Sequence, residues 1–342
     1  MRVLYHLTVP PSALAECDAV VQEVRALQGH FGGTIDHLYP GRVPGTRIPR
    51  QFWGMLRWPR LWWAERYGAV HHIFNPDPYP FVLLRYLRRP VIYTVVAGVQ
   101  ARDQANAQAL ARWVQMLVVA TEQERARLRG WGIDNVRVVR PGIDLTRFAP
   151  TPPPANLPPT LLMGSAPWTC DQFRTKGVDT LLTLARRWPE LHLVFLWRGI
   201  LYEDMMRRVR ASGLSDRVEV INKRVDVNTV LSHVHSAVIL ATEDALIKAY
   251  PHSLLEALAA GRPVIVSQSV SMATEVAQRG YGVVIDEVDE THVQHAVKRL
   301  FRDYPNYQQQ ALGFDKHNFT LEKMLASYAK IYRMFVDDGV LS

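Results

Sequence analysis

The segment from Lys248 to Ser267 brings charged and polar residues together with signals for a helix and a strand. Its pattern predicts a helix over Ser253–Ala260, which Gly261 can end, and then a buried strand over Pro263–Ser267. The first N–H groups of a helix lack partners within the helix, and its dipole is positive there, so this end can bind an anion. Glu256 lies one turn further, where its carboxylate can either bind a diol or cap the helix.

Basic residues follow predicted strands in the same half of the chain. Arg174 and Lys176 lie in a loop downstream of Gly164, and Arg198 and Lys223 each come shortly after a predicted strand. Ligands of parallel sheets lie beyond the carboxyl ends of the strands, and guanidinium and ammonium groups pair with phosphate oxygens. These residues therefore predict contacts with a phosphorylated ligand. An ordinary solvated position is the alternative for Arg174 and Arg198.

The histidines and cysteines form no metal-binding pattern. His71 and His72 are adjacent, so a strand directs them to opposite faces of its sheet. Cys17 and Cys170 lie far apart and lack the spacing of metal ligands. We therefore expect no metal and no cofactor, and we expect reduced thiols in a reducing compartment.

The stretch from Arg50 to Tyr67 is both aromatic and basic. It contains Phe52, Trp53, Trp58, Trp62, Trp63, Tyr67, Arg50, Arg57, Arg60 and Arg66. Tryptophan beside arginine is typical of the headgroup region of a membrane, so an anionic lipid surface is one partner this stretch can have. The alternative is that Leu61, Trp62 and Tyr67 pack under a sheet. We expect a mixture of core and basic surface, with Pro59 interrupting any single helix.

The elements that position these residues alternate between strands and helices in both halves of the chain. In the first half we expect a helix over 12–28 and strands over 2–8, 34–39, 70–74, 91–96, 115–120 and 136–140. In the second half we expect strands over 160–163, 191–197, 218–221, 237–240 and 263–267, with helices over 177–187, 202–212, 228–235 and 253–260. This alternation predicts two parallel α/β sheets, with a ligand in the cleft between two lobes.

The proline-rich stretch Ala149–Pro159 divides the chain into nearly equal halves. Residues 1–150 hold 19 Arg, no Lys and 11 acidic residues, so they carry the whole net charge of +8. A one-sided basic lobe favours an anionic partner, or reflects an arginine-rich composition of the surface.

Composition and motifs exclude several classes of protein. With 48% hydrophobic and 21% charged residues among 342, the chain is neither disordered nor fibrous. No apolar stretch approaches the roughly 18 residues of a membrane span, and the N-terminus has no long apolar signal core, so we expect a cytoplasmic protein. No nucleic-acid motif accompanies the basic charge, and no G-x-G-x-x-G follows the first strand.

Four segments, in this order along the family's chain, resemble the retaining glycosyltransferases of family 4, the glycosyl transferases group 1. Val136–Pro150 resembles the end of their N-terminal lobe, and Gly164 with Arg174–Leu182 resembles their diphosphate-binding loop. Lys248–Ser267 resembles their donor-site motif, and Phe319–Tyr332 resembles their last helix. The resemblance implies the α/β GT-B fold, two Rossmann-like parallel-sheet lobes facing across a cleft.

The resemblance also divides the chain and assigns its ligands. It implies an acceptor-side lobe over 1–150, joined by a C-terminal helix over 320–342, and a nucleotide-sugar-binding lobe over 151–319. The residues it implies in catalysis are Lys176, Arg174 and Lys248. The donor-binding residues are Gly164, Ser165, Arg198, Lys223, His252, Ser253, Leu254, Leu255 and Glu256. The acceptor-side residues are Ser12, Asp77, Thr94 and Gly98.

Within this set, Lys176 is expected to neutralise the leaving diphosphate, and a charge placed there acts in the transition state. Ser253, Leu254 and Leu255 are expected to offer backbone N–H groups or a hydroxyl to the phosphates, and Glu256 to bind the nucleotide ribose. Arg174 is expected to supply the charge that the family commonly has at Ser165.

The sequence departs from the family at three places. Lys248 stands where the first Glu of the donor-site motif belongs, and a Lys cannot accept hydrogen bonds from sugar hydroxyls. It can bind a phosphate or carboxylate on the donor sugar, or lie in solvent. Val96 or Ala97 stands where a His often ends the strand, and the loop Thr8–Ala13 lacks the usual glycine pair.

These observations predict a retaining, metal-independent hexosyltransferase. It would move a sugar from a nucleotide-diphosphate sugar to a hydroxyl acceptor, and lipid-linked or cell-envelope glycans are among the acceptors this prediction admits. Peripheral attachment to the inner face of the cytoplasmic membrane is compatible with the basic first half. The alternative is a catalytically decayed GT-B scaffold or binding subunit.

Overall fold

The computed structural model describes residues 2–11, 14–41, 46–67, 70–152, 154 and 157–335. The chain forms two compact units. The first unit comprises Met1–Gly142 and Asn318–Ser342, and the second comprises Ile143–His317. Sequence analysis placed the division eight residues later, in the proline-rich stretch, because proline signals an extended linker and not a boundary between cores.

Within the described residues the first unit contains a six-stranded parallel sheet in the order β2-β1-β3-β4-β5-β6. Its strands are β1 (Val3–Leu7), β2 (Gly33–His37), β3 (Val70–Asn75), β4 (Val91–Val95), β5 (Met116–Val119) and β6 (Val136–Val138). Both faces of the central strands are buried, which explains their nearly continuous apolar sequences.

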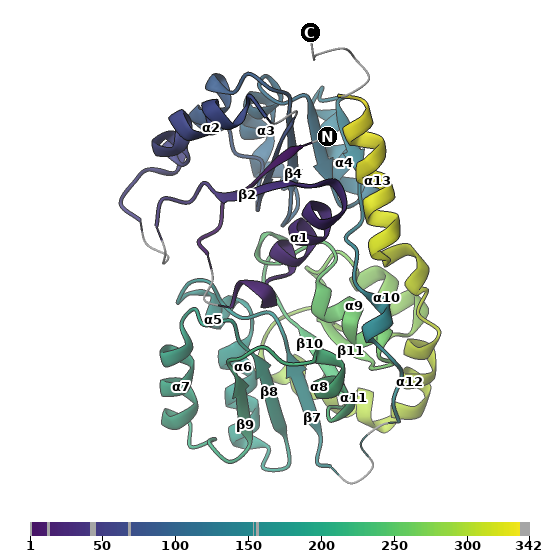
Figure 1. Ribbon diagram of the computed structural model, residues 1–342. Helices are drawn as coiled ribbons and strands as arrows, with labels where there is room; N and C mark the ends of the chain where they lie inside the picture. The colour runs from purple at the N-terminus through teal and green to yellow at the C-terminus, as the bar shows by residue number, and fades with distance from the viewer. Residues whose placement is uncertain are drawn as a thin grey trace. The chain divides into compact units, whose positions relative to one another are not determined.

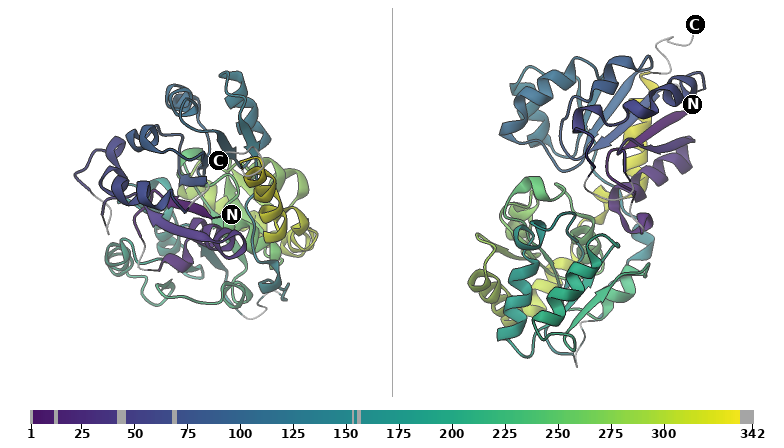
Figure 2. Two further views of the ribbon diagram at one scale, coloured as in Figure 1. Left: turned by 45° about the horizontal axis from the view of Figure 1, so that its top comes forward. Right: turned by 90° about the vertical axis from the view of Figure 1, so that its left-hand side faces the viewer.

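Helices cover both faces of this sheet (Figure 1). They are α1 (Ala19–Phe31), α2 (Trp58–Ala64), α3 (Gln104–Ala111), α4 (Glu122–Gly130) and α13 (Leu321–Arg333). α1 and α13 share one core cluster with the sheet, and α2, α3 and α4 share another. In both views of Figure 2 the yellow α13 lies near the purple N-terminal strand of its unit. The last helix of the chain thus completes the first unit.

The second unit, over its described residues, also contains a six-stranded parallel sheet, in the order β12-β11-β10-β7-β8-β9. The strands are β7 (Thr160–Met163), β8 (His192–Leu196), β9 (Val218–Ile221), β10 (Ser236–Ile239), β11 (Val264–Ser267) and β12 (Gly282–Ile285). The helices are α5 (Gln172–Thr175), α6 (Val178–Arg187), α7 (Tyr202–Ala211), α8 (Val227–Ser232), α9 (His252–Ala259), α10 (Ala273–Arg279), α11 (Glu290–Arg302) and α12 (Tyr304–Leu312).

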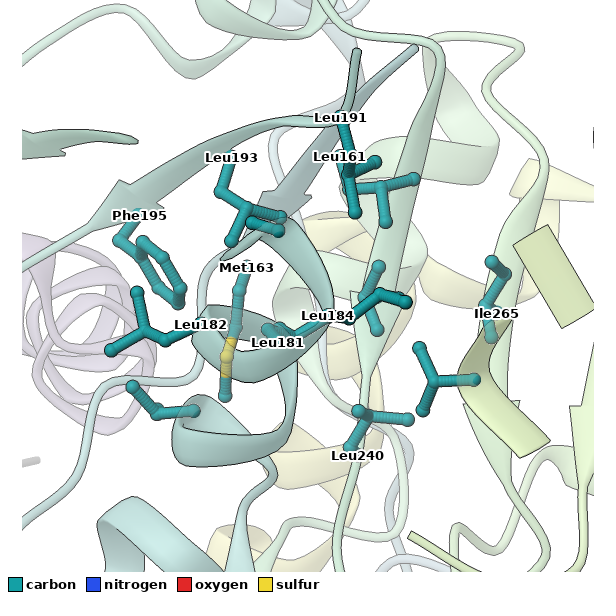
Figure 3. Close-up of a cluster of buried hydrophobic side chains, with 14 of the residues drawn as sticks. Leu161, Met163, Leu181, Leu182, Leu184, Leu191, Leu193, Phe195, Leu240 and Ile265 are labelled. Carbon is teal, nitrogen blue, oxygen red and sulfur yellow. The ribbon is translucent and has the colours of Figure 1, made fainter. Parts of the chain in front are cut away.

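One face of the second sheet is covered by α6, α7 and α11. Figure 3 shows leucines of α6 among the side chains of β7 and β8, with Leu240 and Ile265 at the edge of the cluster. The α9 helix contacts β10, α8 and α12. This packing holds α9, which carries the candidate residues His252 to Glu256, against the sheet, and it holds α6, which directly follows the turn with Lys176.

Two predictions about the first unit are wrong. The helix expected over 12–28 begins only at Ala19, because the Asp18 carboxylate accepts hydrogen bonds from Val20 N at 2.9 Å and Val21 N at 3.3 Å and caps it there. Pro59 does not interrupt α2 but lies in its first turn, where its missing N–H costs no hydrogen bond.

In the described part of the chain, no helix has both the length and the apolar composition needed to cross a membrane. Cys17 and Cys170 belong to different units and form no disulfide with each other.

Candidate active site

The second sheet reverses its strand order between β7 and β10. From β7 the chain proceeds outward through β8 and β9, and it then returns to place β10 on the other side of β7. In open parallel sheets such a reversal opens a crevice at the carboxyl ends of the two strands, where ligands bind. The residues that follow β7 and β10 are therefore the first candidates for a binding site.

The structure brings Gly164 and Ser253 together at this point. Gly164 directly follows β7, and Ser253 lies in the first turn of α9. A Cβ atom built on Gly164 would lie only 2.9 Å from the Ser253 Cβ, so a larger residue at 164 would push the helix away. Two residues that sequence analysis predicts to bind the donor, almost ninety positions apart in the sequence, are thus neighbours. The N-terminal end of α9 faces the loop after β7.

The first turn of α9 corrects part of the prediction. The N–H groups of Leu254 and Leu255 both donate to the Pro251 carbonyl oxygen at 3.1 Å, because Pro251 is the N-cap residue. Their side chains are fully buried. Leu254 and Leu255 therefore anchor the helix, and Ser253 is the residue of this turn with a hydroxyl that can meet an anion.

Lys176 is held by a tight turn between α5 and α6. Gly177 adopts φ +72°, and a side chain there would collide with Leu240, which follows β10. The Thr242 N–H donates to the Thr175 carbonyl oxygen at 2.9 Å, tying the turn to the loop after β10. The Lys176 side chain is only 5% exposed. Lys176 is thus fixed near the strand reversal.

Arg174 and Arg198, for which sequence analysis left the same two alternatives open, lie in different environments. The Arg174 side chain is 74% exposed and pairs with Asp171 at 3.0 Å. Arg198 donates to the carbonyl oxygen of Ala166, in the loop after Gly164, and its guanidinium lies 4.3 Å from the centroid of the Trp168 ring. Arg198 is therefore the better-placed arginine for a charge beside Ser165.

Two polar oxygens near the strand ends lack partners in the described part of the chain. They are Ser165 Oγ and Asn222 Oδ1, both buried. Buried polar atoms without partners are rare and mark places where a ligand or water completes the hydrogen bonding. Lys223, next to Asn222, is exposed. The loops after β7 and β9 thus hold unused hydrogen-bonding groups.

Glu256 lies on α9 in a low-dielectric environment. Burial raises the pKa of its carboxyl, while the nearby His252 and Arg147 lower it in part. Its carboxylate makes no hydrogen bond to another described residue. Hydrogen bonds donated by hydroxyl groups of a ligand would stabilise a carboxylate in this setting. Lys248, half-buried, lies two residues after a short 3-10 helix over Asp244–Leu246 and four before α9.

The acceptor-side predictions lie in the first unit, and Ser12 falls outside the described residues. The Thr94 hydroxyl is buried, 2.7 Å from His72 Nε2 and 3.1 Å from the Tyr328 hydroxyl, so it belongs to the core beneath α13. Gly98 adopts φ +100°, and a Cβ there would lie 2.9 Å from Glu124 Oε1. The Glu124 carboxyl therefore packs directly against the loop after β4. Burial raises the pKa of this carboxyl.

Asp77 belongs to a polar cluster where the first sheet reverses between β1 and β3. Arg50 Nη1 donates to Asp77 Oδ2 at 2.9 Å, and the Arg50 guanidinium lies 4.3 Å from the centroid of the Tyr79 ring. Asn75 accepts hydrogen bonds from Thr8 and Arg50 and donates to Asp77. Sequence analysis noted Arg50 only as part of a basic segment, because nothing local links it to a loop 27 residues away.

Glu287, Asp289 and His292 form a group that meets the spacing of metal ligands, within the residues described. His292 Nδ1 lies 2.8 Å from Asp289 Oδ2, and this carboxylate raises the pKa of the imidazole. The group caps the start of α11, and its members are exposed or half-buried. Its contacts are those of a helix cap.

A match to a known protein family covers the part of the chain that holds most of the candidate site residues. Residues 172–312 match the family described as glycosyl transferases group 1, and this region contains Lys176, Arg198 and Glu256. No curated protein sequence matches the chain. The family match supports a glycosyltransferase of group 1.

Solved structures share the fold over nearly the whole chain. Sucrose-phosphate synthase from Thermosynechococcus elongatus has a TM-score of 0.71 at 16% identity, covering 98% of this chain and 100% of that one. HepE from Anabaena, in complex with UDP-glucose, has a TM-score of 0.72 at 13% identity and the same coverage. WaaG, a glycosyltransferase involved in lipopolysaccharide biosynthesis, has a TM-score of 0.68 at 14% identity over 97% and 99%. The expected GT-B fold is confirmed.

Proposed function

We propose that the chain is a retaining glycosyltransferase that moves a sugar from a nucleotide-diphosphate sugar to a hydroxyl acceptor. The observation that carries this proposal is the close approach of Gly164 and Ser253 at the strand reversal of the second unit. It sets a serine at a helix end beside a glycine-led loop, which suits a diphosphate. The family match over residues 172–312 supports the same chemistry.

In the proposed reaction the acceptor hydroxyl attacks the anomeric carbon from the face that the diphosphate leaves. The bond from C1 to the phosphate oxygen breaks, the bond from C1 to the acceptor oxygen forms, and the hydroxyl proton passes to the departing phosphate. Negative charge grows on the diphosphate as it leaves. Lys176 and Arg198 would stabilise that charge, and Ser253 would donate to it.

The nucleotide would extend toward two further groups. The Glu256 carboxylate would accept hydrogen bonds from the ribose hydroxyls. The loop after β9, with Asn222 and Lys223, would contact the base. UDP-sugars are the first donors to test, because the structure of HepE holds UDP-glucose. Lys248 replaces an acid near the donor sugar, so a uronic acid donor such as UDP-glucuronate belongs in the same screen.

We propose that the acceptor is a lipid-linked or cell-envelope glycan, that the transferred sugar is a hexose, and that no metal takes part. The basic first half of the chain and the role of WaaG in lipopolysaccharide biosynthesis support such an acceptor. Lys176 and Arg198 supply the positive charge that a metal would otherwise give. A decayed scaffold has no support from the family match or the intact donor-side residues.

The first test is a thermal-shift screen of the purified protein with UDP-, GDP- and ADP-sugars in EDTA. A ligand that binds only the folded chain at 100 times its Kd stabilises it by about 2.7 kcal/mol, so one nucleotide class should raise Tm clearly. Lys176→Met should abolish most of this shift and lower transfer about 100-fold or more.

Lys330→Met is the matched control, since Lys330 is exposed on α13 in the other unit. It should retain both the shift and the transfer. If no nucleotide sugar shifts the parent protein, or if the Lys176 variant shifts as the parent does, the proposed donor site is wrong. An NMR assignment of the product anomer separates retention from inversion.

A further inference from the structure

Large aromatic side chains gather on the surface of the first unit. Trp63 is 55% exposed and Tyr67 is 57% exposed, although both side chains are mostly apolar. They belong to a set contributed by α2 and the turn after it, by the 3-10 helix over Val82–Tyr86 and by the turn after α3. Its exposed members are Trp58, Trp62, Trp63, Tyr67, Tyr86 and Trp113. Monomeric soluble proteins rarely expose so many large aromatic residues together.

Arginines join these side chains into one face. The Arg88 guanidinium lies 5.3 Å from the centroid of the Trp62 ring, and Arg85 lies 5.4 Å from that of Trp113. The rings of Trp58 and Tyr86 meet edge-on at 5.7 Å between centroids. These contacts link three segments, which Figure 1 draws on one side of the first sheet.

We call this surface the aromatic–arginine face; its basic members are Arg60, Arg66, Arg85, Arg88 and Arg112, all exposed. Over residues 50–67, 82–88 and 104–113 the one acidic residue is Glu65. The Glu65 carboxylate is buried and accepts hydrogen bonds from His71 and from backbone N–H groups. None of the five arginines takes part in a salt bridge within the described residues. The face is therefore strongly and uniformly positive.

Core packing does not account for the face. Only Leu61 of α2 is buried, whereas Trp62 and Tyr67 are exposed, so the stretch is the expected mixture of core and basic surface and not the alternative with all three under the sheet. A helix of two turns can direct only one stripe toward the core, and Leu61 occupies it. The tryptophans and tyrosines remain outside, next to cations.

We propose that the aromatic–arginine face docks the protein on an anionic lipid bilayer. Tryptophan and tyrosine rings suit the boundary between acyl chains and headgroups, and arginines pair there with lipid phosphates. A second copy of the chain fits less well, because a symmetric contact would oppose five arginines to five arginines. Only the role of this docking rests on the proposed function: it would bring the enzyme to a lipid-linked acceptor.

Vesicle flotation tests this proposal without any sugar donor. The full chain is mixed with vesicles of phosphatidylcholine alone or with phosphatidylglycerol added, in 50 mM salt. We expect flotation only with the anionic vesicles and its loss as salt is raised. Vesicles with brominated acyl chains should quench tryptophan fluorescence, and a Trp63→Phe variant should lose part of that quenching.

Two triple variants locate the interaction. The first variant combines Arg60→Glu, Arg66→Glu and Arg112→Glu. Each basic residue near the surface contributes about fivefold to membrane binding, so this variant should weaken partition by at least about 100-fold. Arg279→Glu, Arg299→Glu and Arg302→Glu change the net charge equally on exposed sites of the second unit and should leave partition within a few fold. Nucleotide-sugar thermal shifts should be the same in both variants.

Several outcomes would overturn the proposal. No flotation of the parent at low salt removes it, and equal loss in the two triple variants shows a non-specific effect of net charge. If the parent protein forms oligomers that dissociate only in the first variant, the aromatic–arginine face binds a second copy of the chain instead of a bilayer. Tight RNA binding without vesicle binding indicates a nucleic-acid partner. A failed thermal-shift screen, in contrast, affects the proposed function and leaves vesicle binding to be judged by itself.

Discussion

Arg262 fixes the start of the second unit through a single side chain. It has no exposed surface, and its Nε donates to the Leu231 carbonyl oxygen at 2.7 Å. Its Nη1 and Nη2 reach the carbonyl oxygens of Thr151 and Pro152 at 3.0 Å and the Thr151 hydroxyl at 2.6 Å. A planar fork with five donors can satisfy acceptors in these different directions, and no other side chain offers it.

We expect Arg262→Lys to destabilise the second unit by about 3 kcal/mol, because an ammonium group leaves some of these buried oxygens without a donor. Urea unfolding followed by circular dichroism measures this loss. Arg299→Lys, at an exposed position of α11, is the control and should change stability by less than about 0.5 kcal/mol. Equal stability of the two variants would show that the buried fork is dispensable.

Residues of the candidate site differ in how far the sequence could predict them. Lys176, Ser253 and Glu256 lie in local patterns of loop, helix and strand, so their places followed from the sequence. The different environments of Arg174 and Arg198 did not, because they depend on an ion pair with Asp171 and on the Trp168 ring. Arg262 was missed for the same reason, since three of its acceptors lie about 110 positions away.

At the scale of elements, the strands were predictable and some helix ends were not. β7 and β9 have the bounds that the sequence predicts. β7 is buried along its whole length and is a short, mostly apolar run, whereas β9 is an edge strand in which apolar residues flank the exposed Glu219. The start of α1 depends on the Asp18 cap, and the orientation of α2 depends on packing of Leu61 alone. β12 and the helices α10 to α12 lacked a motif strong enough to place them.

The contact between Gly142 and α13 shows how the last helix is held in the first unit. A Cβ on Gly142 would lie 2.8 Å from Leu321 Cα, 2.9 Å from Met324 Cβ and 3.0 Å from the Thr320 carbonyl oxygen. Backbone atoms cannot move aside as a flexible side chain can. The backbone at Gly142 and the start of α13 thus pack so closely that no methyl group fits between them.

We expect Gly142→Ala to destabilise the first unit by about 1–3 kcal/mol, because the added methyl displaces α13. Gly29→Ala is the matched control, since Gly29 lies within α1 and a Cβ there meets no atom within 4 Å. It should stabilise the same unit by up to about 1 kcal/mol, because Ala favours a helix. Chemical denaturation of both variants gives the comparison, and a neutral Gly142→Ala would mean that α13 is loosely held.

At the scale of the whole molecule, the sequence predicted where charge is concentrated but not the surface it forms. The excess of arginine over residues 1–150 was visible by counting. The aromatic–arginine face was not, because it joins α2 to residues near 86 and 113 that only the fold brings together. The same fold buries His6, His71 and His72 in the first sheet, so burial of His6 and His72 links the stability of this unit to pH.

These histidines lie in two hydrogen-bonded groups on opposite faces of the sheet. His6 Nε2 lies 2.8 Å from His71 Nδ1, and His71 Nε2 lies 3.0 Å from Glu65 Oε1. On the other face His72 contacts the Thr94 and Tyr332 hydroxyls at 2.7 and 2.6 Å. Burial holds the pKa of His6 and of His72 well below the ordinary value, and the positive charges of His71 and Arg57 lower that of His6 further.

The direction of the pH effect follows from these lowered pKa values. Below about pH 6.5 the unfolded chain protonates His6 and His72 while the folded chain does not, so the unfolded state binds more protons. The free energy of unfolding of the first unit should therefore be highest above pH 6.5. It should fall by up to about 1.4 kcal/mol per pH unit for each histidine as the solution is acidified. Urea unfolding at pH 7.5, 6.5 and 5.5 measures this slope.

His72→Asn should reduce that slope, whereas His317→Asn, which removes an exposed histidine of the second unit, should leave it unchanged. If the first unit is as stable at pH 5.5 as at 7.5, the buried histidines must accept protons as readily folded as unfolded. They would then have to reach water or a free carboxylate. Glu65 contacts His71 on the face opposite to His72, so the His72 variant distinguishes the two groups.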